Sequence, residues 1–214
     1  MAPPEVTPAW IVSELDRARE EAASADAIVA FDADGTLWGG DVGLDLYEAL
    51  LDEGGVRDAA RDGLAAEARE LGLRADGDTL SIVRDLYAAY NEDRWPLARA
   101  FAAMAWTFAG WHEAELDAFA ARVTVRAKLA ARVRPELEPV RAWARERGVD
   151  LYVVSASPIA IVALGAALLG VPRANVIAMT PAIDAHGVVE PRLAGRVVYG
   201  DGKLESLRAL RPNA

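Results

Sequence analysis

Apolar residues along this chain follow two different periods, and the change from one to the other divides the sequence into regions. Residues 28–31 and 150–154 are short, continuous apolar runs, and residues 175–179 form a third. Such runs are typical of strands buried on both faces in a parallel sheet. Residues 186–189 and 195–199 are expected to form two short antiparallel strands, or else a hairpin with its turn at 185–187.

Elsewhere the apolar residues recur at the spacing of an amphipathic helix, with polar residues on the opposite face. The longest such region runs from residue 39 to about residue 131 and contains no convincing strand. Asp78 is the expected N-cap of one helix, and Gly148 is expected to end another. The predicted helices cover residues 9–23, 42–52, 56–71, 79–90, 96–108, 113–131, 135–147, 158–169 and 203–210.

The order of strands and helices predicts an α/β protein with a three-layer, Rossmann-like core and a mostly parallel sheet. We expect residues 1–39 and 132–214 to form this discontinuous core, and residues 40–131 to form a helical insert after the first strand. In open α/β sheets, ligands bind just past the carboxyl ends of the strands. The residues that follow Phe31 are therefore where a functional site is expected.

Composition narrows the classes of function. The chain has 214 residues and is 53% apolar, which predicts a sizeable buried core. Its formal charge of −10 argues against a nucleic-acid partner, which requires a basic surface. The absence of cysteine excludes disulfides, thiolate metal sites and a cysteine nucleophile, and it fits a cytoplasmic location.

No segment predicts contact with a membrane. Residues 1–8 lack the basic and apolar regions of a signal peptide. The most apolar run, residues 158–171, is shorter than the roughly 18 residues that a membrane span needs, and it predicts a buried helix instead. We therefore expect a cytoplasmic protein without a membrane partner, and the sequence leaves its oligomeric state open.

Two carboxylates, Asp32 and Asp34, directly follow the first strand and precede a turn at Gly35 and Thr36. Two acids in this position can divide the work of a nucleophile and of a general acid and base. They can also hold Mg²⁺, which binds proteins through one or two carboxylates plus a substrate phosphate. The alternative is a strand that ends in a solvated turn and carries no chemistry.

The segment Phe31-Asp32-Ala33-Asp34-Gly35-Thr36-Leu37 resembles the first signature of the haloacid dehalogenase (HAD) superfamily, a hydrophobic residue before Asp-x-Asp-Gly-Thr. The resemblance implies that Asp32 attacks phosphorus to form an aspartyl-phosphate, while Asp34 protonates the leaving group and then activates water. It also implies that Asp32 and Asp34 bind Mg²⁺, Asp34 through its backbone carbonyl. Dehalogenases of the superfamily lack the second acid, so Asp34 favours phosphoryl transfer.

Two more signatures of the family have matches. Val153-Val154-Ser155 resembles the second, and Lys203 in Gly200-Asp201-Gly202-Lys203 resembles the third. The resemblance implies that Ser155 and Lys203 bind the phosphate, together with Gly35 and Thr36. From the residues alone, a serine here can instead cap the next helix, and a lysine can be a solvated surface residue.

The insert resembles the helical cap of phosphoserine-phosphatase-like members, which closes over the substrate and excludes water. At its entrance we expect Trp38 and Asp41 to contact the substrate. The tryptophans of the insert, Trp95, Trp106 and Trp111, can form a cage for a quaternary ammonium group or fill the core of the helical bundle. The second interpretation is favoured.

One part of the family pattern has no match. The fourth signature supplies further carboxylate ligands to Mg²⁺ from a later strand, and residues 204–214 do not contain it. We therefore expect an incomplete metal site, in a chain that is truncated or completed by other means. The favoured function is Mg²⁺-dependent hydrolysis of a small phosphorylated metabolite. The alternatives are a non-catalytic or truncated HAD-like fragment and a phosphotransferase or phosphomutase.

Overall fold

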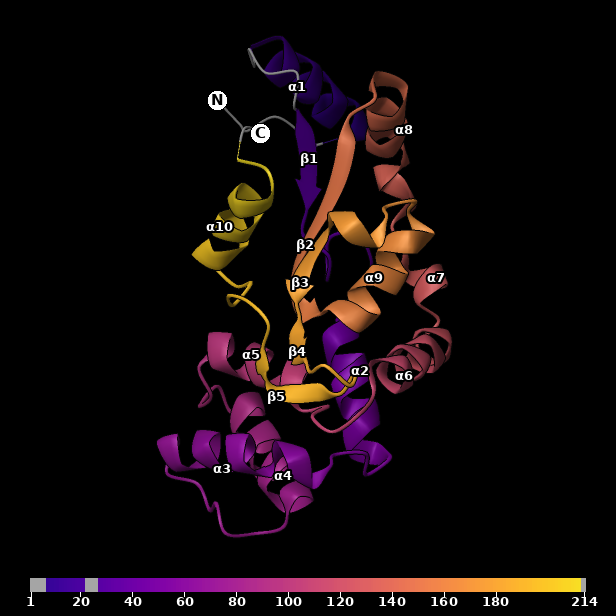
Figure 1. Cartoon of the computed structure of the whole chain (residues 1–214). Coiled ribbons are helices and arrows are strands. Elements are labelled where there is room, and N and C mark those ends of the chain that lie inside the picture. Colours follow the sequence, from indigo (N-terminus) through magenta and orange to yellow (C-terminus); the bar gives the residue numbers. More distant parts are fainter. Residues whose placement is uncertain (1–6, 22–26, 213–214) are drawn as a thin grey trace.

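The protein is built around a parallel sheet of three strands. The computed structural model describes residues 7–21 and 27–212 (Figure 1). Strands β1 (Ile28–Phe31), β2 (Asp150–Pro158) and β3 (Val176–Met179) lie in the order β1-β2-β3. Ile28 pairs with Asp150 and Phe31 pairs with Val153, so the residues after β1 lie beside the second half of β2.

Helices cover both faces of this sheet, as the sequence predicts. On one face, Val153 of β2 packs in a core with α9 (Ile159–Leu168), and Leu151 contacts a cluster with α8 (Glu138–Arg147). Helix α1 (Pro8–Glu21) joins this side, because Val12 and Leu15 pack in the same cluster as α8. On the other face, Val154 packs with Leu207 of α10 (Asp201–Leu210). The three-layer α/β arrangement is confirmed.

The region between β1 and β2 is helical, and residues 32–149, all of which the structure describes, contain no strand. Helices α3 to α5 lie beyond the carboxyl ends of the three strands (Figure 1). The helices are α2 (Val42–Asp52), α3 (Arg61–Glu70), α4 (Thr79–Asn91), α5 (Leu97–Trp106), α6 (Glu113–Arg126) and α7 (Leu129–Arg132), with 3₁₀ turns at Asp58–Ala60 and Pro135–Leu137.

These helices contribute to two separate apolar cores. Helices α3, α4 and α5 form most of one core, around residues such as Leu64 and Leu86. Helix α6 instead packs Phe119 in the core that contains Val153 and α9, and α2 contributes side chains to both cores. The division of the chain at residues 39/40 and 131/132 stays a prediction.

The predicted and observed elements differ at several boundaries. The helix expected over 113–131 breaks because Lys128 has a left-handed backbone with a φ of 52°, and α7 follows it. The helix expected over 56–71 begins as a 3₁₀ turn, and the last helix begins two residues earlier than expected. Residues 22 and 23 of the first predicted helix lie outside the described residues.

The expected pair of short strands is partly wrong. Strands β4 (Pro181–Ile183) and β5 (Val189–Leu193) form the hairpin, and residues 195–199 are not a strand. The apolar residues of that stretch are used differently, because Val198 packs in the loop before α10 and its N–H donates to the sulfur of Met179 at 3.4 Å. Among the described residues, no helix has the length and apolar character needed to cross a bilayer.

Candidate active site

The loop that follows β1 carries the two acids predicted from the sequence. A tight turn holds this loop, in which the carbonyl of Ala33 accepts the N–H groups of Thr36 and Leu37 at 3.1 and 2.8 Å. Gly35 has a φ of 74°, which is the left-handed conformation that glycine adopts without strain. The turn therefore requires a glycine between the second acid and the threonine.

Asp32 lies at an open position beside a lysine from the far end of the chain. Its Oδ1 accepts a hydrogen bond from Lys203 Nζ at 2.5 Å, and its Oδ2 accepts one from the Thr36 hydroxyl at 3.3 Å. The Asp32 side chain is 45% exposed, so a ligand can reach its carboxylate. The structure thus brings together three of the residues that the sequence singles out.

Two glycines explain how Lys203 reaches Asp32. Gly200 has a φ of 55° and a ψ of −130°, a conformation that is open to glycine and strained for other residues. A Cβ placed on Gly202 would lie 2.1 Å from the carbonyl oxygen of Val197, so only glycine fits there. The Gly-x-Gly-Lys segment therefore lets the first turn of α10 pack against the preceding loop and points Lys203 at the sheet.

Asp34 has a different environment, in which three donors hold its carboxylate. Oδ1 accepts the indole N–H of Trp38 and the backbone N–H of Val42, both at 2.8 Å. Oδ2 accepts the hydroxyl of Ser157 at 2.7 Å. The donors come from the loop, from the start of α2 and from the end of β2, so they fix the rotamer of Asp34 from three sides.

Ser157 was not identified from the sequence as a partner of Asp34. A Cβ on Gly43 would lie 2.5 Å from the Ser157 hydroxyl oxygen, so α2 can approach the end of β2 this closely only with glycine at position 43. The hydroxyl oxygen of Ser155 accepts the backbone N–H of Ser157 at 3.1 Å, and Ser155 itself is buried. Neither serine caps α9, which begins after Pro158 without a side-chain cap. The only signal in the sequence was the Ser-x-Ser spacing at a strand end.

Trp38 and Asp41 belong to the segment that leads from Asp34 into α2. Trp38 is fully buried, and its contact with the site is the hydrogen bond from its indole to Asp34. Asp41 is the N-cap of α2, where its side chain accepts the N–H of Leu44 at 2.9 Å. Burial raises the pKa of the Asp41 carboxyl, and the nearby charge of Asp34 raises it further.

A narrow pocket opens between Asp41 and the end of β2. Its walls come from the start of α2, from α5 and from the strand end, and Phe101 in the wall meets Tyr199 edge to face at 5.3 Å. Burial and the charge of Asp41 raise the pKa of Tyr90, which packs against Phe101. The lining residues are Asp41, Gly43, Leu44, Phe101, Met104, Ala156, Ser157 and Pro158.

The tryptophans of the helical insert are structural. Trp95 and Trp106 are buried in the core of α3, α4 and α5. Trp111 is half-buried, donates its indole N–H to the carbonyl of Gly55 at 2.9 Å and packs on Phe119. These contacts agree with the core-filling interpretation. The aromatic side chain in direct contact with the site is that of Trp38, through its indole N–H to Asp34, and Phe101 lines the pocket beside Asp41.

The oxygen donors for a metal ion are few. The carboxylate of Asp32 and the backbone carbonyl of Asp34 suit a hard cation such as Mg²⁺, which often completes its shell with water and substrate phosphate. The Asp34 carboxylate is already held by three donors. No group of three or more His, Cys, Asp or Glu side chains with metal-binding spacing occurs in residues 7–21 and 27–212. The Asp32 carboxylate and the Asp34 carbonyl therefore fit a metal ion that takes most of its remaining ligands from water and substrate phosphate.

Comparisons with known proteins find a matching family and similar folds. A family model described as haloacid dehalogenase-like hydrolase matches residues 29–214. A protein of unknown function from Bordetella pertussis Tohama I is similar, with a TM-score of 0.64 and 20% identity over 87% of this chain and 74% of its own. A functionally unknown protein from Anaerococcus prevotii DSM 20548 is also similar, with a TM-score of 0.58 and 14% identity over 89% of this chain and 72% of its own.

A third solved structure carries a family description. It is a HAD family hydrolase from Salmonella enterica serovar Typhi, with a TM-score of 0.52 and 16% identity, over 97% of this chain and 61% of its own. At these identities the likenesses establish the fold alone. No curated protein matches the sequence.

Proposed function

Because the chain belongs to the haloacid dehalogenase-like hydrolase family, we propose that it hydrolyses small phosphomonoesters through a phosphoryl group carried on Asp32. The observation that supports this most is the contact between Lys203 Nζ and the Asp32 carboxylate at 2.5 Å, together with the exposure of that carboxylate. A nucleophilic carboxylate needs a cation nearby to attack a phosphate dianion, since the two negative charges otherwise repel. Lys203 supplies that cation.

In the first step, a carboxylate oxygen of Asp32 bonds to phosphorus, and the bond from phosphorus to the ester oxygen breaks. The departing oxygen takes the bonding electron pair and a proton from the Asp34 carboxyl. The product is an acyl phosphate on Asp32 and a free alcohol. Fixing Asp34 with Trp38, Val42 and Ser157 holds its carboxyl in one orientation throughout, which reduces the entropy cost of the proton transfer.

In the second step, a water molecule attacks the acyl phosphate while Asp34 accepts one of its protons. The bond from phosphorus to Asp32 breaks, and inorganic phosphate leaves. Ser155, Thr36 and the Gly35 turn are proposed to hold the phosphate oxygens with Lys203. Bound Mg²⁺, held by Asp32 and the Asp34 carbonyl, would supply positive charge to those oxygens.

We propose that the organic part of the substrate lies beside Asp41 and Ser157, the residue that donates to Asp34. Trp38 is proposed to act through Asp34, since it is fully buried.

The proposal is tested with Asp32→Asn in assays with para-nitrophenyl phosphate and Mg²⁺. The substitution removes the nucleophile and keeps the shape of the side chain, so we expect turnover to fall by about 10³-fold or more. Asp62→Asn is the matched control, because Asp62 is an exposed residue of α3 and its loss should leave turnover unchanged. Full activity of the Asp32→Asn protein would overturn the proposed mechanism.

A phosphate-binding protein without turnover is the second candidate. It is favoured by the small set of side-chain metal ligands in the described residues. Thermal shift with Mg²⁺ and beryllium fluoride separates the two, since this phosphoryl mimic should stabilise a competent site at Asp32. Stabilisation by inorganic phosphate alone, with no response to beryllium fluoride and no turnover, would favour the second candidate.

A further inference from the structure

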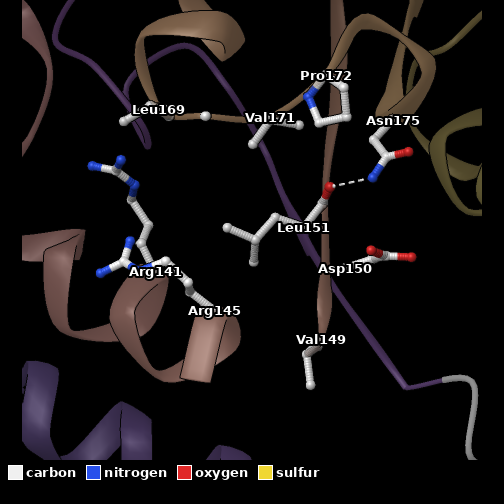
Figure 2. Close-up of a pocket in the computed structure, with 10 residues that line it drawn as sticks. Arg141, Arg145, Val149, Asp150, Leu151, Leu169, Val171, Pro172 and Asn175 are labelled. Atoms are coloured by element: carbon white, nitrogen blue, oxygen red, sulfur yellow. Dashed lines mark hydrogen bonds between the residues drawn. The ribbon is translucent and has the colours of Figure 1, made fainter. Parts of the chain in front are cut away.

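A second hollow lies at the opposite end of the sheet from Asp32. It has a volume of about 300 Å³ and is formed where β2 begins, where α9 gives way to the loop before β3, and along α8 (Figure 2). The pairing of Ile28 with Asp150 places it at the start of β1, whereas the acids follow its end. The lining residues are Arg141, Arg145, Val149, Asp150, Leu151, Leu169, Gly170, Val171, Pro172 and Asn175.

The hollow combines an apolar surface with two cations on one wall. Val149, Leu151, Leu169, Val171 and Pro172 supply the apolar part. Arg141 and Arg145 are one helical turn apart on α8, and Figure 2 shows both side chains on the same side of the hollow. Residues at this spacing share a helix face, so the two guanidinium groups can act on one ligand.

The positive charge of this wall is only partly balanced. Glu138 is the acidic partner of both arginines, with nitrogen–oxygen distances of 2.8 Å to Arg141 and 3.5 Å to Arg145. The Nε of Arg141 is buried and has no hydrogen-bond acceptor among the described residues. A buried N–H without a partner costs free energy, and a ligand oxygen would remove that cost.

The other acid of the hollow does not neutralise the pair. The Asp150 carboxylate points away from Arg141 and Arg145 in Figure 2, and it pairs with Arg211 at 3.3 Å. Asn175 donates its amide N–H to the carbonyl of Leu151 at 3.1 Å, which fixes the far wall. The hollow therefore keeps a net positive wall in a chain whose formal charge is −10.

We propose that this hollow binds a small organic anion, with its carboxylate, sulfonate or phosphate group on Arg141 and Arg145 and its apolar body on the opposite surface. The volume is at the lower end of the range for small-molecule sites. A bare inorganic anion would leave the apolar surface uncovered, so the class of ligand needs both parts. The proposal is independent of the chemistry at Asp32.

The test uses anilinonaphthalene sulfonate, a fluorescent probe with an anionic group on an apolar ring system. We expect saturable binding to the folded chain, and a loss of affinity of about tenfold or more in R141Q/R145Q, since two charge-assisted hydrogen bonds are removed. R122Q/R126Q is the matched control. Arg122 and Arg126 also share one acid, Glu53, and they lie on α6, which does not line the hollow. The control should bind the probe as the parent protein does.

Two further measurements keep the test decisive. The neutral analogue phenylnaphthylamine, which lacks the sulfonate, should bind more weakly than the sulfonate probe. Its affinity should be the same for the parent protein and the variants. R145Q alone changes a mostly exposed side chain, so we expect the fold to persist and the affinity for the sulfonate probe still to fall severalfold. Thermal melting of each variant checks that exposed apolar surface of a partly unfolded state is not the source of fluorescence.

Three outcomes would overturn the proposal. They are equal affinity of R141Q/R145Q and the parent protein, equal loss in the R122Q/R126Q control, and equal binding of the neutral analogue. Loss of binding in Lys203→Gln, with Arg141 and Arg145 intact, would also overturn it, because it would place the probe at the candidate active site.

Discussion

Asp32 and Asp34 have the same side chain and lie two residues apart, yet their surroundings differ. Asp32 is exposed and contacts a cation, whereas Asp34 is held by three neutral donors. The first environment suits a group that must reach phosphorus, and the second suits a group that must stay oriented during proton transfer. At the scale of residues, the division of roles follows from the neighbours of each carboxylate.

Ser157 should position Asp34. We expect Ser157→Ala to lower kcat by about tenfold, which is a fraction of the 10²- to 10⁴-fold that general acid catalysis supplies. Phenyl phosphate should be affected more than para-nitrophenyl phosphate, because the poorer leaving group depends more on proton donation. Kinetics on the two esters measure this difference, with Ser206→Ala as the control, since the Ser206 hydroxyl has no partner among the described residues. Equal loss on both esters would contradict a positioning role.

Asp41 should make stability depend on pH. Because burial and the charge of Asp34 raise the pKa of its carboxyl in the folded protein, ionised Asp41 opposes folding. This cost in folding free energy is absent when the pH lies below the ordinary aspartate pKa of about 3.9. It is complete when the pH lies above the raised pKa of Asp41 in the folded protein. Asp41→Asn keeps an N-cap acceptor and removes the charge, so it should raise the melting temperature at pH 7.

The gain in Asp41→Asn should shrink as the pH falls through the raised pKa and should vanish in acid. Melting curves across this pH range test it, with Asp62→Asn as the exposed control. A gain that is constant with pH would contradict the account.

The sequence predicts the identities of the acids and of Lys203, because short motifs carry them in a fixed order. It does not predict the hydrogen bond from Ser157 to Asp34, because no motif links these two residues, which lie 123 positions apart. It also leaves the place of Trp38 open, because an aromatic residue near a site can be a substrate contact or core. Full burial of Trp38 depends on packing against Gly165, which no local pattern indicates.

At the scale of elements, the backbone at the start of α10 sets the position of the Lys203 ammonium group. Gly202→Ala would bring a Cβ against the Val197 carbonyl, so the first turn must shift and Lys203 must move from Asp32. We expect a loss of stability of about 1–3 kcal/mol and a fall in kcat of at least tenfold.

The matched control for Gly202→Ala is Gly195→Ala, because a Cβ on Gly195 has no atom within 4 Å. Melting and para-nitrophenyl phosphate kinetics of the two variants provide the comparison. Unchanged activity in Gly202→Ala would show that the geometry of this turn does not set the position of the lysine.

Most helices follow from apolar periodicity, and α2 was predicted over the residues it occupies. The breaks were missed for local reasons, since a lysine in a left-handed conformation at residue 128 has no strong signature. Residues 195–199 were misassigned because their apolar residues do pack, but against Met179 and α10 instead of a partner strand. Periodicity reports burial, and it does not report which backbone structure achieves it.

At the scale of the whole molecule, the two apolar cores divide the chain differently from its linear order. Helix α6 belongs to the core of α9 and β2, while α3 and α4 pack with α5. We therefore expect native-state hydrogen exchange to protect the amides of α6 and α9 together, and those of α3 and α4 less strongly. Joint opening of α6 with α3 and α4, apart from α9, would contradict this grouping and support a cap bounded at residues 40 and 131.

The central claim is that Asp32 becomes covalently phosphorylated during turnover. The most direct test is acid quenching of the protein during hydrolysis of para-nitrophenyl phosphate with Mg²⁺, followed by mass spectrometry of the intact chain and its peptides. The account predicts one added phosphoryl group on the peptide that contains Asp32, and its absence in Asp32→Asn. Steady release of phosphate with no adduct on Asp32, and retained turnover in Asp32→Asn, would contradict it.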